Sequence, residues 1–138
     1  RLPSREAPAL VEAATAVERR YGLPSLLLVA VVLAESGGLR KCIGYRRGKG
    51  RTGCDVGAGQ IHVPGCDRAR VQRLLVLSVN LDRAGSILAG SRRQCEAHPS
   101  WAMCRRSKWA GYNAGSRAWW PRVAGIWRRL RGHRGAVA

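Results

Sequence analysis

The sequence predicts a single domain that is mostly α-helical. Its 138 residues are enough for one domain with a real hydrophobic core. Apolar residues recur at helical spacing in several separate stretches of the chain. One stretch, Leu26 to Ala34, holds nine apolar residues without a break, which is far short of the ~20 needed to cross a bilayer. A helix that is apolar on every side belongs inside a core, so we expect the other helices to surround it.

The first predicted helix begins after Ser4, and Glu6, Pro8 and Glu12 suit its early turns. Gly22 ends it. Its apolar positions repeat at helical spacing: Leu10, Val11, Ala14, Val17 and Tyr21. We interpret this helix as scaffold.

The apolar helix that follows leads into Glu35, the first candidate for chemistry. On helical spacing, Glu35 shares a face with Leu28, Val31 and Val32. A carboxyl group against such surroundings loses hydration, which raises its pKa and lets it keep a proton near neutral pH. A glutamate in that state can act as a general acid.

Gly37 and Gly38 end this helix and leave space beside the carboxyl group. A glutamate that simply ends a helix in solvent is the commoner case, and this stretch alone does not exclude it. We favour the functional interpretation of Glu35 because two later stretches of the chain, described below, support it.

Two stretches without helical spacing come next. Arg40 to Gly53 is rich in glycine and cations and predicts a surface loop or short hairpin between Cys42 and Cys54. This segment is either a solvated basic loop or a lip over a substrate groove. Asp55 to Pro64 combines small residues with the amide of Gln60, which indicates backbone that closely approaches another group.

Helical spacing returns from Asp67 to Arg93, as one bent helix or two. The apolar stripe of this stretch consists of Leu77, Leu81, Ala84 and Leu88. Cys95 to Trp101 predicts a turn, and Met103 to Tyr112 predicts a short helix that ends at Asn113-Ala114-Gly115.

The last predicted helix begins near Pro121. Its apolar stripe consists of Val123, Ile126, Trp127 and Leu130, and its arginines lie mostly off that stripe. All five tryptophans fall between Trp101 and Trp127. We expect most of them in the core, with one or two available to floor a sugar site, where aromatic faces pack against pyranose rings.

The charge balance is extreme, with 25 Lys+Arg against 8 Asp+Glu and a formal net charge of +17. Lysine occurs only at Lys41, Lys49 and Lys108, so the cations are nearly all arginine. Such a surface attracts polyanions, namely nucleic acid, anionic lipid or an acidic cell-wall polymer. A cationic nucleic-acid or membrane binder is therefore an alternative, although no recognisable DNA-binding pattern accompanies the charge.

Five cysteines in a small chain indicate an oxidising compartment and two disulfides with one thiol left over. Any of the five can be the unpaired one, so the connectivity stays open. We predict that Cys95 pairs with Cys104 and that the second bridge joins two of Cys42, Cys54 and Cys66. Zinc is the rival, with His62 between Cys54 and Cys66, but no Cys-x-x-Cys occurs and the spacings fit no usual structural zinc site.

The chain begins with Arg1 and shows no secretory signal pattern there. A chain that begins with arginine rather than methionine is expected to have been processed or cut from a longer one, so an export signal could already have been removed. Together with the cysteines, this leads us to expect an exported protein, periplasmic or extracellular.

Three stretches now stand in a recognisable order. Glu35-Ser36 closes the apolar helix, Gly57-Ala58-Gly59-Gln60-Ile61 follows a loop, and Gly111-Tyr112-Asn113-Ala114-Gly115 closes a later helix. This order resembles the soluble lytic transglycosylase family, which shares a lysozyme-like fold with goose-type lysozymes. Asn80-Leu81, with Ile87-Leu88 seven residues on, is similar to the intervening helix of that family. The resemblance covers roughly Pro24 to Gly115 of a single 1–138 domain.

The resemblance implies roles for particular residues. Glu35 would be the catalytic acid and then base, and Ser36 would help to fix the site. Gln60 would line the groove, while Tyr112 would hold the substrate or Glu35 through its hydroxyl, with Asn113 beside it in substrate binding. No metal or organic cofactor is implied.

This sequence also departs from the family pattern. Family members usually carry bulky Leu-Met where this chain has Ala58-Gly59, so the contact of that wall with the sugar differs. Gly111 replaces the usual alanine, and the segment from Cys42 to Cys54 is longer than in many members.

The resemblance therefore implies a lysozyme-like enzyme that cleaves the muramyl–glucosaminyl β-1,4 bond of peptidoglycan. We expect the protein to be a monomer. The arginine-rich surface suits a substrate whose stem peptides bear carboxylates. A hydrolysing muramidase on the same fold is the nearest alternative, because water can replace the C6 hydroxyl of the muramyl sugar.

A count of carboxylates favours the transglycosylase over the muramidase. A glycosidase that uses water normally needs a second Asp or Glu across the bond. Downstream of Glu35 the chain offers Asp55, Asp67, Asp82 and Glu96. We expect Asp67 to cap a helix and Asp82 and Glu96 to be solvated, and a role in fixing the loop is at least as good an explanation for Asp55 as catalysis.

Overall fold

The computed structural model describes residues 7–38, 43–46, 53–113 and 116–134, and in 43–46 and 133–134 the backbone alone. The predicted start at Ser4, the thiol of Cys42 and the pair Ala114-Gly115 lie outside the described residues. The described part is mostly α-helical with one small sheet, as predicted. In chain order its elements are α1 (Ala7–Tyr21), α2 (Leu27–Ser36), β1 (Ile43–Arg46), β2 (Gly53–Val56), β3 (Ile61–Pro64), α3 (Arg68–Leu74), α4 (Leu77–Ala97), α5 (Ala102–Arg106), the 3₁₀ turn η1 (Ala110–Asn113) and α6 (Trp119–Arg134).

Helix α2 lies at the centre of the hydrophobic core. Every residue from Leu27 to Val32 is buried, and α1, α4 and α6 pack against it. Burial of each such leucine or valine contributes about 1.5–3 kcal/mol, which explains why this apolar run belongs inside the core. The helix ends at Gly37, whose φ of 65° is the left-handed conformation that glycine adopts without strain. The predicted core helix and its glycine stop are confirmed.

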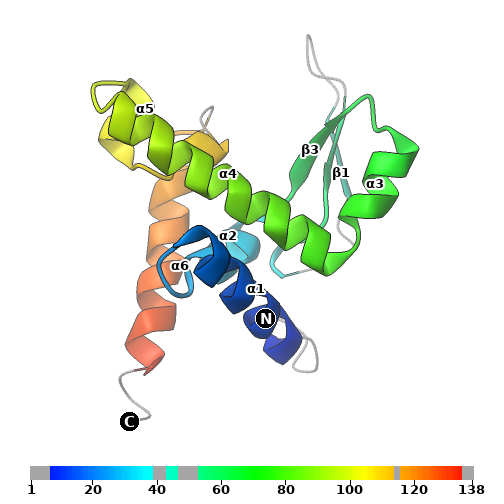
Figure 1. The fold of residues 1–138 in the computed structure, drawn as a ribbon, viewed down its shortest axis with the longest axis horizontal. Coiled ribbons are helices and arrows are strands. Elements are labelled where there is room, and N and C mark those ends of the chain that lie inside the picture. The colour runs from blue at the N-terminus through cyan, green and yellow to red at the C-terminus, as the bar shows by residue number, and fades with distance from the viewer. Residues whose placement is uncertain (1–6, 39–42, 47–52, 114–115, 135–138) are drawn as a thin grey trace.

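The three strands form one antiparallel sheet in the order β1-β2-β3. In Figure 1 the sheet and α3 lie together near one end of α4, whereas α5 lies at its other end and α1, α2 and α6 lie below it. The pairing of β1 with β2 confirms the hairpin expected between Arg40 and Gly53, whose residues 47–52 lie outside the described part. Strand β3 was not predicted, because its alternation of buried Ile61 and Val63 with exposed His62 and Pro64 is too short to stand out.

The stretch predicted as one bent helix or two is two helices, α3 and α4. Asp67 caps α3, since its Oδ1 accepts a hydrogen bond from the backbone N–H of Arg70 at 2.9 Å, as expected. The predicted turn from Cys95 is wrong at its start, because α4 continues to Ala97. The stripe of Leu81, Ala84 and Leu88 is buried, which explains why the helix is stable over this length.

The helix predicted from Met103 to Tyr112 is wrong as a single element, because α5 ends at Arg106 and η1 begins at Ala110. Ser107 has an extended backbone between them, and its Oγ accepts from the N–H of Trp109 at 3.1 Å. A serine side chain that bonds a nearby N–H competes with the helical ladder, which accounts for the break. The last helix, α6, begins at Trp119, two residues before the predicted start.

Two disulfides join Cys54 to Cys66 and Cys95 to Cys104. The first prediction, Cys95 with Cys104, is confirmed, and the second bridge lies within the predicted set. Because Cys54 and Cys66 are bonded to each other, they hold no zinc with His62 between them. Within the described ranges, no helix is both long and apolar enough to cross a membrane, and no three His, Cys, Asp or Glu side chains gather as metal ligands.

Candidate active site

Glu35 lies in the last turn of α2 and is half-buried. The indole Nε1–H of Trp119, at the start of α6, donates a short hydrogen bond to its Oε1. Trp119 is only 1% exposed, so this donor is held rigidly in the core. A fixed N–H aimed at one carboxylate oxygen selects a single orientation for the carboxyl group.

The ring of Tyr112, in η1, packs against the ring of Trp119. The two rings stack with centroids 5.4 Å apart and an interplanar angle of 9°. The hydroxyl of Tyr112 donates to the carbonyl of Gly59 at 2.6 Å. Burial of this hydroxyl and, to a smaller degree, the charge of Glu35 raise the pKa of Tyr112 far above its usual value near 10. The phenol therefore stays neutral and keeps its proton for donation.

The turn between β2 and β3, Gly57 to Gln60, is fixed by the buried amide of Asn80 on α4. Its Oδ1 accepts from the N–H of Gly59 at 2.7 Å, and its Nδ2 donates to the carbonyls of Val56 (2.8 Å) and Leu74 (2.9 Å). Because Asn80 is 1% exposed and its amide has three hydrogen-bond partners, it holds the turn in one conformation. Gly57 has φ 74°, and a Cβ at that position would overlap the Asn80 amide.

Ser36 joins the end of α2 to the same turn. This buried side chain donates from Oγ to the carbonyl of Ala58 at 2.7 Å and accepts from the N–H of Gly38 at 3.2 Å. The residue next to Glu35 thus holds the turn against the helix end. The role of Ser36 in a functional site stays a prediction.

Gln60 ends the turn in the left-handed conformation, with φ 51°. Its Nε2 donates to the carbonyl of Gly57 at 2.9 Å, and the residue is half-buried. Asn113 follows Tyr112 in η1, is also half-buried, and its carbonyl accepts from the N–H of Ser116 at 3.1 Å. Five sequence-predicted residues are thus placed on three elements, and hydrogen bonds link Ser36 and Tyr112 to the turn that carries Gln60.

The structure explains why glycine stands at position 59. A Cβ there would lie 2.8 Å from the Tyr112 hydroxyl, 3.1 Å from the Cβ of Ala84 and 3.2 Å from Oδ1 of Asn80. Gly111 has a similar cause, since a Cβ there would lie 2.6 Å from Oγ of Ser91. At Gly59 and at Gly111, another side chain therefore already occupies the space that a Cβ would need.

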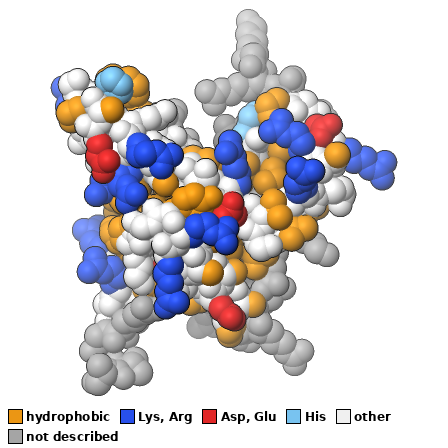
Figure 2. Space-filling view, in the orientation of Figure 1, with side chains coloured by type: hydrophobic (Ala, Val, Ile, Leu, Met, Phe, Trp, Pro, Cys, Tyr) orange, Lys and Arg blue, Asp and Glu red, His pale blue; other side chains and the backbone are white. Residues whose placement is uncertain are grey.

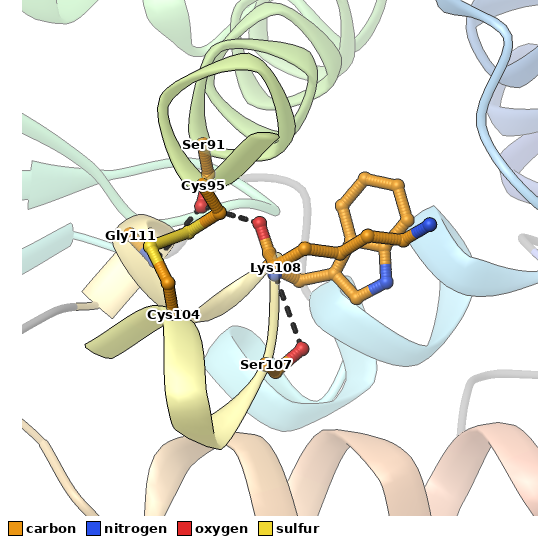
Figure 3. The surroundings of a disulfide bond; sticks show 7 residues. Ser91, Cys95, Cys104, Ser107, Lys108 and Gly111 are labelled. Carbon is orange, nitrogen blue, oxygen red and sulfur yellow. Dashed lines mark hydrogen bonds between the residues drawn. A yellow bond between two sulfur atoms is a disulfide. The ribbon is translucent and has the colours of Figure 1, made fainter. Parts of the chain in front are cut away.

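The η1 turn is fastened to α4 from two directions. Figure 3 shows Oγ of Ser91 between the carbonyl of Lys108 and the N–H of Gly111, at 2.8 and 2.9 Å. The Cys95–Cys104 disulfide ties the end of α4 to α5 in the same view. These contacts fix the turn that carries Tyr112.

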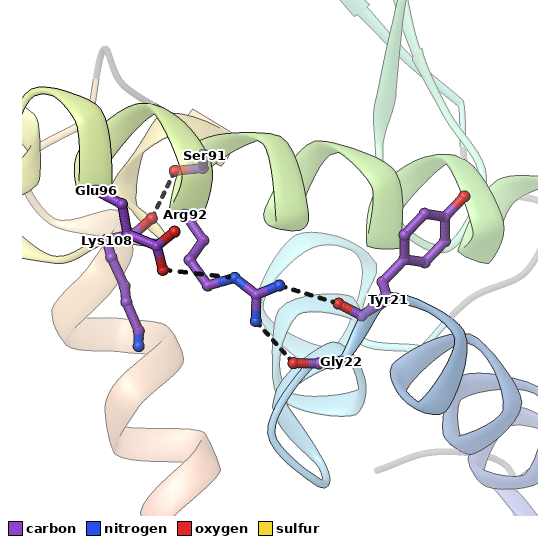
Figure 4. A network of polar contacts seen from close by, with 6 residues as sticks. All are labelled: Tyr21, Gly22, Ser91, Arg92, Glu96 and Lys108. Carbon is purple, nitrogen blue, oxygen red and sulfur yellow. Dashed lines mark hydrogen bonds and ion pairs between the residues drawn. The ribbon is translucent and has the colours of Figure 1, made fainter.

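Helix α4 also holds the end of α1. In Figure 4 the guanidinium of Arg92 donates to the carbonyls of Gly22 (2.8 Å) and Tyr21 (3.3 Å). Its Nε lies 3.9 Å from the carboxylate of Glu96. Such a contact closes the last turn of α1, where free carbonyls need donors.

Sequence reasoning missed two residues that shape the site, Glu18 and Trp119. Glu18 of α1 is 3% exposed, and its carboxylate accepts from the N–H groups of Leu26 (3.0 Å) and Leu28 (2.8 Å) at the start of α2. A carboxylate at a helix N-terminus neutralises the exposed N–H groups and the positive end of the helix dipole. The available signal was a glutamate four residues after Ala14, on an otherwise apolar stripe.

Asp55 and Asp82, two of the carboxylates downstream of Glu35, contact other residues. Asp55 on β2 lies directly across from His62 on β3, with 3.0 Å between Oδ1 and Nδ1, and its side chain is 11% exposed. Asp82 contacts Arg20 at 2.6 Å and the Tyr21 hydroxyl at 3.2 Å.

The arrangement around Glu35 can deliver and recover one proton at a half-buried carboxyl beside two aromatic rings.

Comparison of the chain with protein-family models, curated proteins and solved structures gave no match.

Proposed function

We propose that this protein is a peptidoglycan lytic transglycosylase that cleaves the bond between N-acetylmuramic acid and N-acetylglucosamine. The observation that carries the proposal is the meeting of three motif segments that are far apart in sequence. Ser36 binds the carbonyl of Ala58, and Tyr112 binds the carbonyl of Gly59, so the turn lies between the other two segments. Glu35 is joined to the third segment through Trp119, which donates to Glu35 and stacks on Tyr112.

In the proposed reaction, protonated Glu35 gives its proton to the glycosidic oxygen as the bond to C1 of the muramyl sugar breaks. The glucosaminyl part leaves with a free C4 hydroxyl. The N-acetyl carbonyl oxygen of the substrate attacks C1 and holds the positive charge, which makes a second carboxylate unnecessary.

In the second half of the reaction, ionised Glu35 takes the proton from the C6 hydroxyl of the same muramyl sugar. The C6 oxygen bonds to C1 as the N-acetyl oxygen departs, and a 1,6-anhydro sugar forms. Glu35 ends protonated and no water is consumed. Closure within one molecule is favoured by the high effective concentration of the C6 hydroxyl.

Trp119 and Tyr112 have distinct roles in the proposed reaction. Trp119 orients the carboxyl group and stabilises it while it is ionised, between the two proton transfers. Tyr112 holds the turn at Gly59 and forms an aromatic wall beside Glu35. We assign contact with the sugars to Gln60 and Asn113, which are both half-buried.

A hydrolysing muramidase is the second candidate, because the same acid would serve it. It needs a carboxylate to activate water, and Asp55 is the candidate nearest in sequence to the turn. The contact of Asp55 with His62 across the strands favours a structural role for this carboxylate. We therefore favour the transglycosylase.

An exported location agrees with this function. Two disulfides suit an oxidising compartment, where peptidoglycan is also found. The net charge of +17 attracts the protein to walls that carry carboxylates and phosphates.

The test is release of soluble muropeptides from purified cell walls by the wild type and by Glu35→Gln. The amide cannot donate the proton, so release should fall about 10³-fold or more while the circular dichroism spectrum stays unchanged. Glu96→Gln is the matched control, because the Glu96 side chain is 65% exposed. This variant should retain full activity. A Glu35→Gln protein that releases muropeptides at a tenth of the wild-type rate would contradict the proposal.

A further inference from the structure

The described part of the molecule has a concave surface whose lining includes none of the residues proposed for catalysis or substrate binding. An open groove of about 780 Å³ is formed by residues of α1, β3, α3 and α4, and neither Glu35 nor Tyr112 nor Trp119 lines it. Apolar side chains from three elements give it a hydrophobic floor: Ile61, Leu74, Val79 and Ile87. In Figure 2 hydrophobic side chains lie between cationic ones over the region of α3 and α4.

Helix α4 contributes residues both to the groove and to the contacts that hold the active-site turn. Val79, Arg83 and Ser86 line the groove and follow one another at helical spacing. Asn80 and Ser91, which hold the active-site turn and η1, lie on another stripe of the same helix. Val79 and Arg83 can therefore be changed without altering the stripe that carries Asn80 and Ser91.

The rim of the groove is strongly basic. Arg70, Arg73 and Arg83 line it, are exposed, and form no ion pair within the described part of the chain. The fourth arginine, Arg20, is already paired with Asp82, the single acidic side chain among the lining residues. Three guanidinium groups thus face a groove whose one carboxylate is occupied.

This combination selects among anionic ligands. Arginine binds carboxylates through a planar fork, and an apolar floor adds affinity only if the ligand also carries apolar groups. Single-stranded nucleic acid needs aromatic platforms for its bases, and Tyr21, whose hydroxyl bonds Asp82, is the one aromatic ring besides His62 that lines the groove. A flat membrane does not enter a concave surface. We propose that the groove binds an acidic peptide segment of a partner protein, extended, with carboxylates alternating with apolar side chains.

The probe is a fluorescein-labelled peptide, Gly-Ser-Glu-Leu-Glu-Ile-Asp-Leu-Glu-Gly, and binding is followed by fluorescence anisotropy at physiological salt. The triple variant Arg70→Glu/Arg73→Glu/Arg83→Glu should weaken binding about tenfold or more. The matched control is Arg122→Glu/Arg128→Glu/Arg129→Glu on α6, which changes the net charge equally at exposed positions outside the groove. This control should change the Kd less than about threefold, since only the diffuse field is altered.

The floor is tested separately. Val79→Ser keeps the charge and should weaken binding about three- to tenfold, and so should a probe whose Leu and Ile are replaced by Ser. Equal weakening by both triple variants, or equal binding of the serine probe, would overturn the proposal. The proposal would also be overturned if the binding of a labelled oligothymidylate, or of phosphatidylglycerol vesicles, depended on the groove arginines more strongly than the binding of the peptide does.

This proposal is independent of the catalytic one. The groove triple variant should cleave short soluble glycan fragments at the wild-type rate, because none of its changes lies in the candidate active site. Loss of peptide binding with intact cleavage supports the groove, and no peptide binding by the wild type up to millimolar concentration refutes it whatever the cleavage result.

Discussion

Oε1 of Glu35 accepts a hydrogen bond from Nε1 of Trp119, although 84 positions separate the two residues in the chain. The bond joins the end of the core helix α2 to the start of α6, and Trp119 also stacks on Tyr112. One buried indole thus connects the carboxyl group to the aromatic wall beside it.

Trp119→Phe should test the indole directly. Phenylalanine keeps a ring against Tyr112 but removes the N–H, and a hydrogen bond to a charged group is worth about 1.5–3 kcal/mol. Cleavage of wall fragments should fall about ten- to hundredfold. The rate should also decline at higher pH than in the wild type, because the ionised carboxylate has lost a donor.

Trp120→Phe is the control for that substitution, since Trp120 lies 6.3 Å from Trp119 between ring centroids. It should leave both the rate and the pH profile nearly unchanged. A Trp119→Phe enzyme with a slower rate but an unshifted profile would mean that the indole only supports packing.

Gly59→Ala should destabilise the protein, because the new Cβ would meet the Tyr112 hydroxyl, Ala84 and Asn80. Overpacking of this kind costs about 1–3 kcal/mol. Gly132→Ala is the matched control, since nothing lies within 4 Å of a Cβ there and alanine favours the helix by up to about 1 kcal/mol. Thermal unfolding should show a lower Tm for the first and an equal or higher Tm for the second. Equal melting temperatures for Gly59→Ala and the wild type would show that Tyr112 does not fill this space.

Tyr112 should make the fold sensitive to alkali. The pKa of Tyr112 is raised in the folded state. Its contribution to the free energy of unfolding is therefore complete below about pH 10, where the unfolded chain also keeps the phenol protonated. Above that pH the unfolded state loses its proton first, and the free energy of unfolding falls as pH rises. Tyr112→Phe should flatten this decline in urea titrations at pH 9 to 11.

Glu35→Gln separates the two causes of the raised pKa. It removes the charge of Glu35 but leaves the burial of the hydroxyl, which is the larger cause. Most of the alkaline decline should therefore remain in Glu35→Gln. A decline that is as steep in Tyr112→Phe as in the wild type would mean that other groups produce it.

The Cys95–Cys104 bridge should stabilise the η1 turn that carries Tyr112. Cys95→Ala/Cys104→Ala should lower stability by about 2–4 kcal/mol and reduce the cleavage rate. Non-reducing peptide mapping of the wild type should recover Cys54 with Cys66 and Cys95 with Cys104. Free thiols at all four positions would refute both bridges and the oxidising compartment with them.

Local patterns predicted much of the helical scaffold. The uninterrupted apolar run placed α2 in the core, Gly37 ended it, and Asp67 capped α3, because each of these signals acts within a few residues. The break at Ser107 and the strand β3 were missed. At Ser107, one side-chain hydrogen bond interrupts a sequence pattern that is otherwise typical of a helix. In β3, an alternation of only four residues cannot be distinguished from a loop.

The candidate site was less predictable, since its contacts are long-range. Motif resemblance pointed to Glu35, Gln60 and Tyr112, but no spacing reveals that the Tyr112 hydroxyl binds the carbonyl of Gly59. Trp119 lies among several tryptophans, and only the packing of α6 against α2 decides which of them reaches Glu35.

The mass of the product tests the central claim most directly. Purified walls digested with the wild-type protein should yield muropeptides that end in 1,6-anhydro-muramic acid, each lighter by one water than a hydrolase product. Asp55→Asn should give the same products at a rate within about tenfold, because the contact of Asp55 with His62 is structural in this account. Muropeptides with reducing-end muramic acid, together with an inactive Asp55→Asn enzyme, would contradict the transglycosylase and assign water activation to Asp55.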